Sequence, residues 1–219
     1  MNKKQIFQYK EYIARIVANK NVLDIGSIGH NFKDRYNRYH FWIFDVLKSN
    51  AKFIVGIDCL KNSVIEARKE GYNVVYGDAQ NFNLGKKYDI IFAGDIIEHL
   101  SNPGLFIDNC RRHLRKDGLI IISTPNTYSF ARLFRVLEQW TNNPITNTEH
   151  TFYFTPQVLN ELFGRYGFSP IQERYFTTNL KYVGLMRIAQ VINDSLCFIF
   201  GKKFKESLVI IYKINENGS

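Results

Sequence analysis

The sequence predicts an α/β protein built around a doubly wound sheet whose strands are mostly parallel. Short apolar runs alternate with segments of helical periodicity, at about thirty residues per unit. Three successive runs end in an acidic residue, namely Asp24, Asp58 and Asp78. The runs are rich in Ile, Val and Leu, which is typical of parallel strands that are covered on both faces.

The first half of the chain supplies three strand–helix units. Apolar residues from Ile6 to Val17 recur at helical spacing and predict an amphipathic helix before the first strand. Gly71 closes a later helix, because glycine readily adopts the left-handed conformation at helix ends. The expected elements are a buried strand over 22–25, a helix within 30–47 that covers the next turn, a strand over 52–58, a helix over 62–70 and a strand over 73–78.

The second half continues this pattern and departs from it after Pro125. A strand over 88–94, a helix over 103–116 stopped by Asp117-Gly118, and a strand over 119–123 extend the parallel part of the sheet. The later elements are a helix over 128–140, a polar loop over 141–149, a helix over 157–166, and strands over 168–176 and 208–214 that we expect to pair in antiparallel fashion. The sheet then has seven strands, mostly parallel, with an antiparallel last strand.

Length and composition fit a single domain over 1–219. A chain of 219 residues, 45% of them hydrophobic, can bury one substantial core. We expect a helical or loop cap over 126–154 and an apolar helical insertion over 180–204. The three cysteines are widely spaced and the start has no apolar signal core, so we expect a cytoplasmic protein without disulfides.

The net charge of +9 favours anionic partners, but the basic residues stand in short groups rather than in one stripe. We therefore expect a solvated basic surface, with a nucleic-acid groove as the alternative. Within the insertion, the stretch from Leu180 to Phe200 is strongly apolar but contains three charged residues, Lys181, Arg187 and Asp194, which a membrane span tolerates poorly. We expect it to pack on its own domain, and membrane-surface contact through 180–205 stays open because Lys202, Lys203 and Lys205 follow it.

The acids at the strand ends predict an adenosine-containing ligand. Ligands of doubly wound sheets bind beyond the carboxyl ends of the strands. Asp58 can accept hydrogen bonds from both ribose hydroxyls, and Asp78, followed by the small Ala79, can accept one from the adenine amino group. The alternative is that these acids only cap helices.

The turn Gly26-Ser27-Ile28-Gly29 follows the first strand, and its glycines let a ligand approach the backbone. A dinucleotide site requires a GxGxxG turn around a pyrophosphate, and Asp24 would place an anion beside that anion. A cationic sulfonium suits the acidic turn better, which indicates S-adenosylmethionine.

Five successive motifs carry a family resemblance. They are NVLDIGSIGH, FIVGIDCL, VVYGDA, YDIIFAGDIIEHLSNP and HLRKDGLIIISTPN, and they span about residues 20–126. These motifs resemble those of class I S-adenosylmethionine-dependent methyltransferases, in particular the group that includes ubiquinone-biosynthesis O-methyltransferases and glycan and natural-product enzymes. The similarity continues through His150 and TPQVLNELFGRYGF. It implies a Rossmann-like methyltransferase fold.

The resemblance also implies cofactor-binding residues. Asp24, Gly26 and Ser27 would form the turn beside the methionine part, Asp58 would hold the ribose hydroxyls with Cys59 beside it, Asp78 and Ala79 would contact the adenine, and Gly94 and Asp95 would line the methionine side. The chain departs from the family's DxGxGxG pattern, because Ile28 and His30 occupy the second and third glycine positions. His30 either points into the pocket or leads the following helix.

Catalysis of methyl transfer requires an aligned nucleophile, and a hydroxyl acceptor also benefits from a positioned base. Two Glu-His pairs are available, at 98–99 and 149–150. His150 lies in the loop where the family places substrate-facing residues, so we take it as the first candidate for a base or substrate ligand. His99 is the second candidate for this role. For each histidine, the alternative is a purely structural role. The spacing of these pairs fixes no metal site, so none is predicted.

The leading functional hypothesis is a methyltransferase that uses S-adenosylmethionine, releases S-adenosylhomocysteine and acts on a small molecule or glycan at a hydroxyl oxygen. A nucleic-acid methyltransferase is the alternative that the charge suggests, although Gly94 to Ile97 lacks the Asn/Asp-Pro-Pro-aromatic pattern of base-amino methylases. The third hypothesis is a non-catalytic nucleotide-binding module. His40 and His113 are expected at the surface, and the oligomeric state is not determined by the sequence.

Overall fold

The computed structural model describes residues 3–34, 36, 41–130, 132, 149–177 and 185–215. The helix expected over 128–140 lies largely outside these residues, as do much of the cap over 126–154 and the first part of the insertion over 180–204. His40 also lies outside them.

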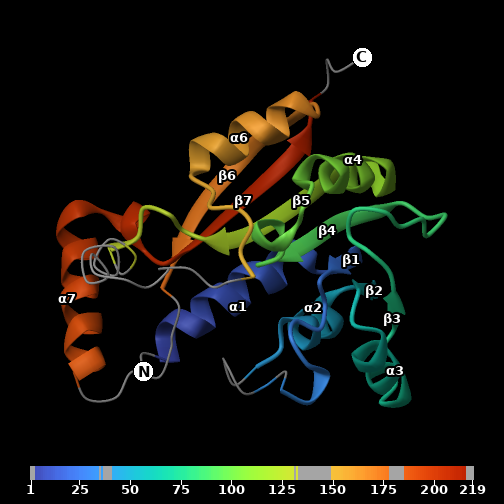
Figure 1. The fold of residues 1–219 in the computed structure, drawn as a ribbon, viewed down its shortest axis with the longest axis horizontal. Helices are drawn as coiled ribbons and strands as arrows, with labels where there is room; N and C mark the ends of the chain where they lie inside the picture. Colours follow the sequence, from blue (N-terminus) through green and yellow to red (C-terminus); the bar gives the residue numbers. More distant parts are fainter. Residues whose placement is uncertain are drawn as a thin grey trace.

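A seven-stranded sheet with the order β3-β2-β1-β4-β5-β7-β6 forms the centre of the molecule (Figure 1). Its strands are β1 (Asn21–Ile25), β2 (Phe53–Asp58), β3 (Val74–Tyr76), β4 (Tyr88–Gly94), β5 (Leu114–Pro125), β6 (Phe168–Phe176) and β7 (Ser207–Ile214). The first five strands run parallel, and β7 pairs in antiparallel fashion with both β5 and β6. This topology confirms the predicted sheet and its antiparallel last strand.

Helices cover both faces of the sheet, as expected for strands that are apolar on each side (Figure 1). One layer contains α1 (Lys3–Val17), α2 (Ile43–Asn50) and α3 (Lys61–Lys69), and the other contains α4 (Pro103–His113) and α6 (Pro156–Arg165). Adjacent residues of β1 show the alternation, because Val22 packs with the first layer and Leu23 with the second. In the second layer, the ring of Phe163 stacks on that of Tyr212 at 3.9 Å between centroids.

The last helix, α7 (Leu185–Phe200), stands away from the sheet and leads into the short helix η3 (Lys202–Phe204) before β7 (Figure 1). None of the helices in the described ranges is both long enough and apolar enough to cross a membrane. All three cysteines are free thiols, as the sequence predicts.

Two boundaries differ from the sequence-based expectation. The helix expected over 103–116 ends at His113, and β5 begins at Leu114 rather than at 119. Leu114 is buried and pairs with Tyr88, and the residues up to Leu119 form an irregular stretch in which the register shifts. The burial of Leu114 therefore draws the chain into the sheet earlier than the position of Asp117-Gly118 suggests. The helix expected within 30–47 begins only at Ile43.

The backbone at Gly26 predicts a stability difference between two glycine variants. Gly26 has a φ of 75°, and a Cβ there would lie 2.7 Å from Cδ1 of Ile96, whereas Gly29 has a φ of 76° and open space around it. Gly29→Ala should lower the free energy of unfolding by about 1 kcal/mol, because only backbone strain opposes it. Gly26→Ala adds the steric contact with Ile96 and should lower the free energy of unfolding by about 3 kcal/mol. Urea unfolding measures both variants. Equal losses would contradict the close packing of Gly26 on Ile96.

Candidate active site

The turn after β1 is fastened to the end of β2. The backbone N–H groups of Gly26 and Ser27 donate to the carbonyl of Ile57, with N···O distances of 2.9 and 3.2 Å. Ser27 is buried, and a Cβ at Gly56 would lie 2.6 Å from the Ser27 hydroxyl. The absence of a side chain at Gly56 therefore allows the turn to fold down on β2.

Asp58 closes the turn from the other side. One carboxylate oxygen accepts a hydrogen bond from the N–H of Ile28 at 2.9 Å, and the other accepts from the N–H of Leu60 at 3.0 Å. Burial raises the pKa of Asp58, while these backbone N–H groups oppose the shift. The backbone N–H groups of Gly29 and Cys59 also interact with this carboxylate. With one geometrically good hydrogen bond to each oxygen, the carboxylate can hold the turn and still accept hydroxyl donors.

Asp24 lies beside this carboxylate in the interior of the sheet. It pairs in register with Gly56 of β2 and Phe92 of β4, and its side chain is 1% exposed. Burial, followed by the negative charge of Asp58, raises the pKa of Asp24 well above its usual range. Its Oδ2 is buried without a hydrogen-bond partner. A buried carboxyl group that lacks a hydrogen-bond partner on one oxygen favours a nearby cation or hydrogen-bond donor. The sulfonium of S-adenosylmethionine fits that requirement.

The predicted adenine-side residues lie at the ends of β2 and β3. Ala79 is buried, and Asp78 is exposed with one carboxylate oxygen accepting from the N–H of Gln80 at 2.9 Å. Cys59 follows Asp58 and is exposed. The structure thus brings Asp24, Asp58 and Cys59 together, with Asp78 at the end of the neighbouring strand.

The end of β4 adopts an unusual backbone conformation. Asp95 has a φ of 50°, in the left-handed region that non-glycine residues seldom adopt. Its N–H donates to the carbonyl of Ser123 at 2.9 Å, and the Ser123 hydroxyl donates to its carboxylate at 3.1 Å. The next residue, Ile96, packs against Gly26. This turn therefore adjoins the turn after β1, as the predicted roles of Gly94 and Asp95 require.

Both candidate histidines meet just beyond this turn. The His99 and His150 rings are 4.6 Å apart in an edge-to-face arrangement. The N–H groups of Thr151 and Phe152 donate to the carbonyl of Glu98 at 2.8 and 3.1 Å, and these two bonds fix the segment that carries His150. His99 and His150 thus belong to one cluster, although 50 residues separate them in the chain.

Glu149 extends this cluster to the turn after β1. Its carbonyl lies 3.1 Å from Nδ1 of His99, and its carboxylate lies 3.4 Å from Nδ1 of His30. His30 is exposed and faces Glu149. The structure places His30 at the solvent-facing rim, against Glu149, and does not decide between the two roles considered for it.

Glu98 is a functional candidate that the sequence analysis missed. It is 1% exposed, and its Oε2 accepts a hydrogen bond from the Thr124 hydroxyl at 3.0 Å, while Oε1 has no partner. Burial, followed by the negative charge of Asp95, raises the pKa of Glu98 to about 8. Ligand atoms of Glu98, His99 and His150 lie within 4.8 Å of one another, so these residues could hold a metal ion. The spacing of the Glu-His pairs alone does not predict this cluster.

One histidine prediction was wrong. His113 is buried rather than at the surface: its Nε2 accepts from the N–H of Leu84 at 3.2 Å, and its ring packs on Phe82 at 4.4 Å. The basic residues around it in the sequence conceal the fact that this side of α4 faces the core. His113 therefore has a structural role.

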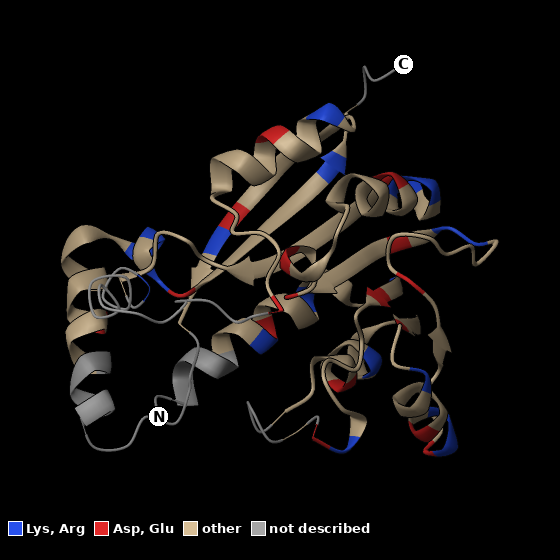
Figure 2. Ribbon diagram, in the orientation of Figure 1, with Lys and Arg blue, Asp and Glu red and all other residues tan. Residues whose placement is uncertain are grey.

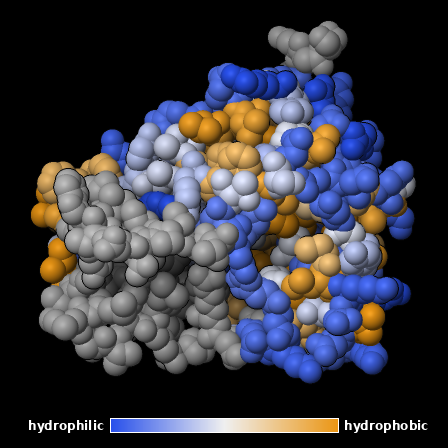
Figure 3. Space-filling model, in the orientation of Figure 1, coloured by the Kyte–Doolittle hydropathy of each residue, from blue (hydrophilic) through white to orange (hydrophobic). Residues whose placement is uncertain are grey.

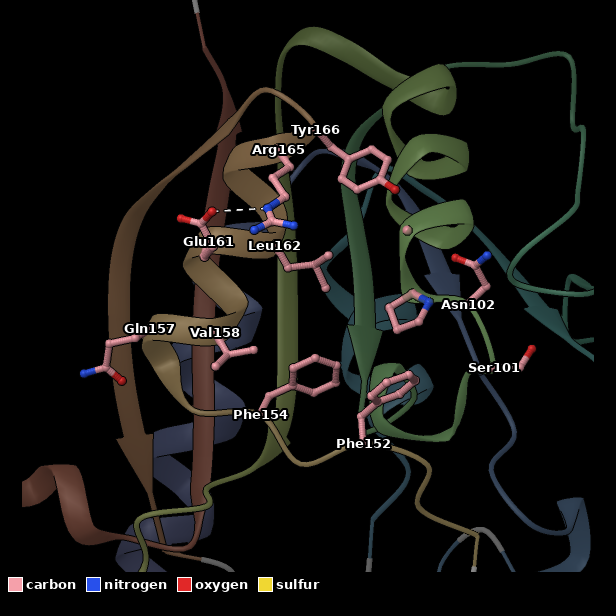
Figure 4. A pocket seen from close by; sticks show the side chains of 12 residues that line it. Ser101, Asn102, Phe152, Phe154, Gln157, Val158, Glu161, Leu162, Arg165 and Tyr166 are labelled. Carbon is pink, nitrogen blue, oxygen red and sulfur yellow. Dashed lines mark hydrogen bonds and ion pairs between the residues drawn. The ribbon is translucent and has the colours of Figure 1, made fainter.

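A groove of about 660 Å³ lies between α4 and α6 (Figure 4). Asp24, Asp58 and Asp78, which we call the carboxylate row, do not line it. Phe152, Phe154 and Leu162 supply apolar walls, and Glu161 and Arg165 form an exposed ion pair at its edge (Figure 4). It includes none of the predicted cofactor residues. Phe152 connects it to the histidine cluster through its hydrogen bond to Glu98.

The raised pKa of Glu98 predicts a pH dependence of stability. Between about 4.5 and about 8 the folded protein keeps a proton that the unfolded chain releases, so the free energy of unfolding falls as the pH rises. Glu98→Gln keeps an acceptor for Thr124 and removes the titration. In EDTA-containing buffer, the free energy of unfolding of the variant relative to that of wild type should rise by a few kcal/mol between pH 5 and pH 8. Urea unfolding measures this difference. The exposed Glu161→Gln is the control, and parallel pH profiles for Glu98→Gln and wild type would contradict the buried neutral acid.

Comparisons with known proteins identify the family of the chain. A family model described as a methyltransferase domain matches residues 2–173. A ubiquinone biosynthesis O-methyltransferase of Rickettsia prowazekii is 34% identical over 90 residues, which are 38% of this chain and 36% of the relative. One of Cereibacter sphaeroides (strain ATCC 17025) is 24% identical over 137 residues, which are 58% of this chain and 55% of the relative. The matches thus span about a third to about a half of these relatives' length.

Solved structures share the fold. A SAM-dependent methyltransferase from Archaeoglobus fulgidus has a TM-score of 0.63 at 19% identity, covering 94% of this chain and 91% of the other. The magnesium protoporphyrin IX methyltransferase of Synechocystis PCC 6803, solved with bound SAH, has a TM-score of 0.61 at 12% identity, covering 95% and 83%. Because the family model covers more than half of the sequence, the chain belongs to the methyltransferase domain family, which confirms the predicted class: a class I S-adenosylmethionine-dependent methyltransferase domain.

Proposed function

We propose that the chain acts as one methyltransferase domain that binds S-adenosylmethionine along the carboxylate row and methylates a hydroxyl oxygen of a small molecule or glycan. The observation that carries this proposal is the buried carboxylate of Asp24 beside Asp58, at the turn fastened to β2, whose Oδ2 has no hydrogen-bond partner among the described residues. When bound, S-adenosylmethionine supplies an electrophilic methyl group on a sulfonium.

Different residues bind the ribose, adenine and methionine parts of the cofactor. Asp58 accepts the ribose hydroxyls with the lone pairs that its backbone bonds leave over. Ala79 and Asp78 flank the adenine, with Cys59 beside the ribose. Asp24, Gly26, Ser27, Gly94 and Asp95 line the methionine side. Because backbone hydrogen bonds already fix Asp58 and Asp95, little ordering is needed when the ligand binds.

His150 is the proposed base, and His99 and Glu98 are its proposed supports. The edge-to-face contact with His99 restricts the His150 ring, and the bonds from Thr151 and Phe152 to Glu98 fix its backbone segment. His150 would accept the hydroxyl proton as the acceptor oxygen forms its bond to the methyl carbon. A positioned base of this kind contributes about a hundredfold or more to the rate.

Two observations favour a small-molecule acceptor with a hydroxyl oxygen. Relatives named as ubiquinone biosynthesis O-methyltransferases favour a small molecule and an oxygen atom, and Phe152, Phe154 and Tyr153 supply aromatic surface near His150. The net charge of +9 keeps nucleic acid as the second candidate.

A transfer assay tests the proposal. The full chain is incubated with methyl-labelled S-adenosylmethionine and with separate panels of catechols, hydroxylated sugars and total RNA. We expect label on a hydroxyl-bearing small molecule or glycan, and a loss of about a hundredfold in kcat for His150→Gln, because the proton then has no acceptor. S-adenosylhomocysteine affinity should stay within about twofold of wild type, because His150 is placed on the acceptor side.

His30→Gln is the matched control, since His30 contacts the same Glu149 from the rim. Its kcat should stay close to that of wild type. Labelled RNA, or cofactor binding without transfer to any panel, would contradict the proposed acceptor. An unchanged kcat in His150→Gln would contradict the proposed base.

A further inference from the structure

Helix α7 carries its apolar residues on the outside. Within its described side chains, Val191, Ile192, Phe198 and Ile199 are 60, 48, 91 and 69% exposed, and helical spacing places them on one face. Ser195 lies among them, and its hydroxyl donates to the carbonyl of Val191 at 2.9 Å. The polar group on this face is therefore already satisfied within the helix.

The inner side of α7 is partly polar. Asn193 and Cys197 are the buried side chains, one turn apart. The amide of Asn193 donates to the carboxylate of Glu206 at 2.8 Å, which ties the helix to the chain just before β7. A surface helix of a water-soluble domain normally shows the opposite arrangement, with apolar residues inward. The outer face of α7 is therefore suited to an apolar environment.

A cluster of positive charge adjoins this face. Lys202, Lys203 and Lys205 follow α7 directly, and none of them forms a salt bridge with a carboxylate in the described part of the chain. Arg174 lines a hollow of about 310 Å³ together with Lys202 and Lys205. Figure 2 shows this basic group in blue next to α7, and Figure 3 shows the apolar side chains of α7 in orange at the edge of the molecule.

The active-site edge of the sheet anchors the same segment. The amide of Asn126, directly after β5, donates to the carbonyls of Lys203 and Lys205 at 2.8 and 2.6 Å. The ring of Phe130 stacks on that of Phe204 at 4.5 Å. The apolar face and the lysines thus lie at the carboxyl end of β5, at the edge where the cofactor turns also lie.

We propose that α7 and η3 form a membrane-docking surface, with Val191, Ile192, Phe198 and Ile199 inserted into the interface of a bilayer and the three lysines on its anionic headgroups. The 16 residues of α7 are fewer than the roughly 20 needed to span a bilayer, so the helix lies in the interface plane. Charge complementarity selects this partner. Anionic headgroups attract the lysines that adjoin the apolar face, whereas a second copy of this chain, with its net charge of +9, is repelled. The inference does not depend on the proposed acceptor.

Vesicle co-sedimentation of the full chain tests this surface. The probes are phosphatidylcholine vesicles with and without phosphatidylglycerol. We expect binding to the anionic vesicles that weakens as sodium chloride is raised, because salt screens the lysines. Phe198→Ser with Ile199→Ser removes the inserted side chains, and Lys202→Gln with Lys203→Gln and Lys205→Gln removes the charge. Each set should weaken binding by about tenfold or more.

Matched variants distinguish binding through this surface from nonspecific binding of exposed apolar or basic residues to vesicles. Ile65→Ser with Leu105→Ser removes two exposed apolar residues on α3 and α4, and Lys61→Gln with Lys69→Gln and Lys87→Gln removes three exposed lysines elsewhere. Both sets should bind vesicles like wild type, and all variants should keep the wild-type circular dichroism and S-adenosylhomocysteine affinity. Three results would overturn the proposal. Wild type could fail to bind anionic vesicles, or the α7 variants could bind them as strongly as wild type does. The third result is a wild-type dimer that does not bind vesicles and that the α7 variants abolish.

Discussion

Two carboxylates buried side by side, Asp24 and Asp58, are the constraint around which the site is built. Asp58 is held by the N–H groups of Ile28 and Leu60, whereas Asp24 has a buried oxygen without a partner. Burial, followed by the negative charge of Asp58, raises the pKa of Asp24, and burial raises the pKa of Asp58. Such an arrangement weakens the protein on its own and is relieved by a cationic ligand. The family to which the chain belongs uses a cofactor of that charge.

The rest of the fold serves to place this pair and to surround it. The parallel register sets Asp24 opposite Gly56, and the missing side chain there admits the turn that carries Ser27. The left-handed backbone of Asp95 directs Ile96 onto Gly26, so the turns after β1 and β4 form one surface. Beyond it, hydrogen bonds to the Glu98 carbonyl hold the segment with His150. Backbone interactions thus join the cofactor side to the acceptor side.

The sequence predicts the strands and their acids well because strand periodicity and an acid after an apolar run are local signals. It does not predict that His99 meets His150, since that contact depends on hydrogen bonds between segments 50 residues apart. Glu98 was missed for a related reason: the short helix η2 (Ile97–His99), which follows β4, turns its side chain toward Thr124. His113 was misplaced because its basic neighbours suggest a surface, and the orientation of α4 decides otherwise.

Thermal unfolding of Asp24→Asn with and without S-adenosylmethionine tests the central claim most directly. Asparagine removes the charge that Asp58 opposes, so at pH 8 the free variant should melt above wild type, while the ligand-induced rise in Tm should shrink. Asp89→Asn is the matched control at the other end of the sheet. Its carboxylate accepts from the N–H of Asn21 and pairs with Arg115, so the free Tm should fall and the ligand-induced rise should persist. A lower free Tm and an undiminished ligand-induced rise in Asp24→Asn would contradict the account.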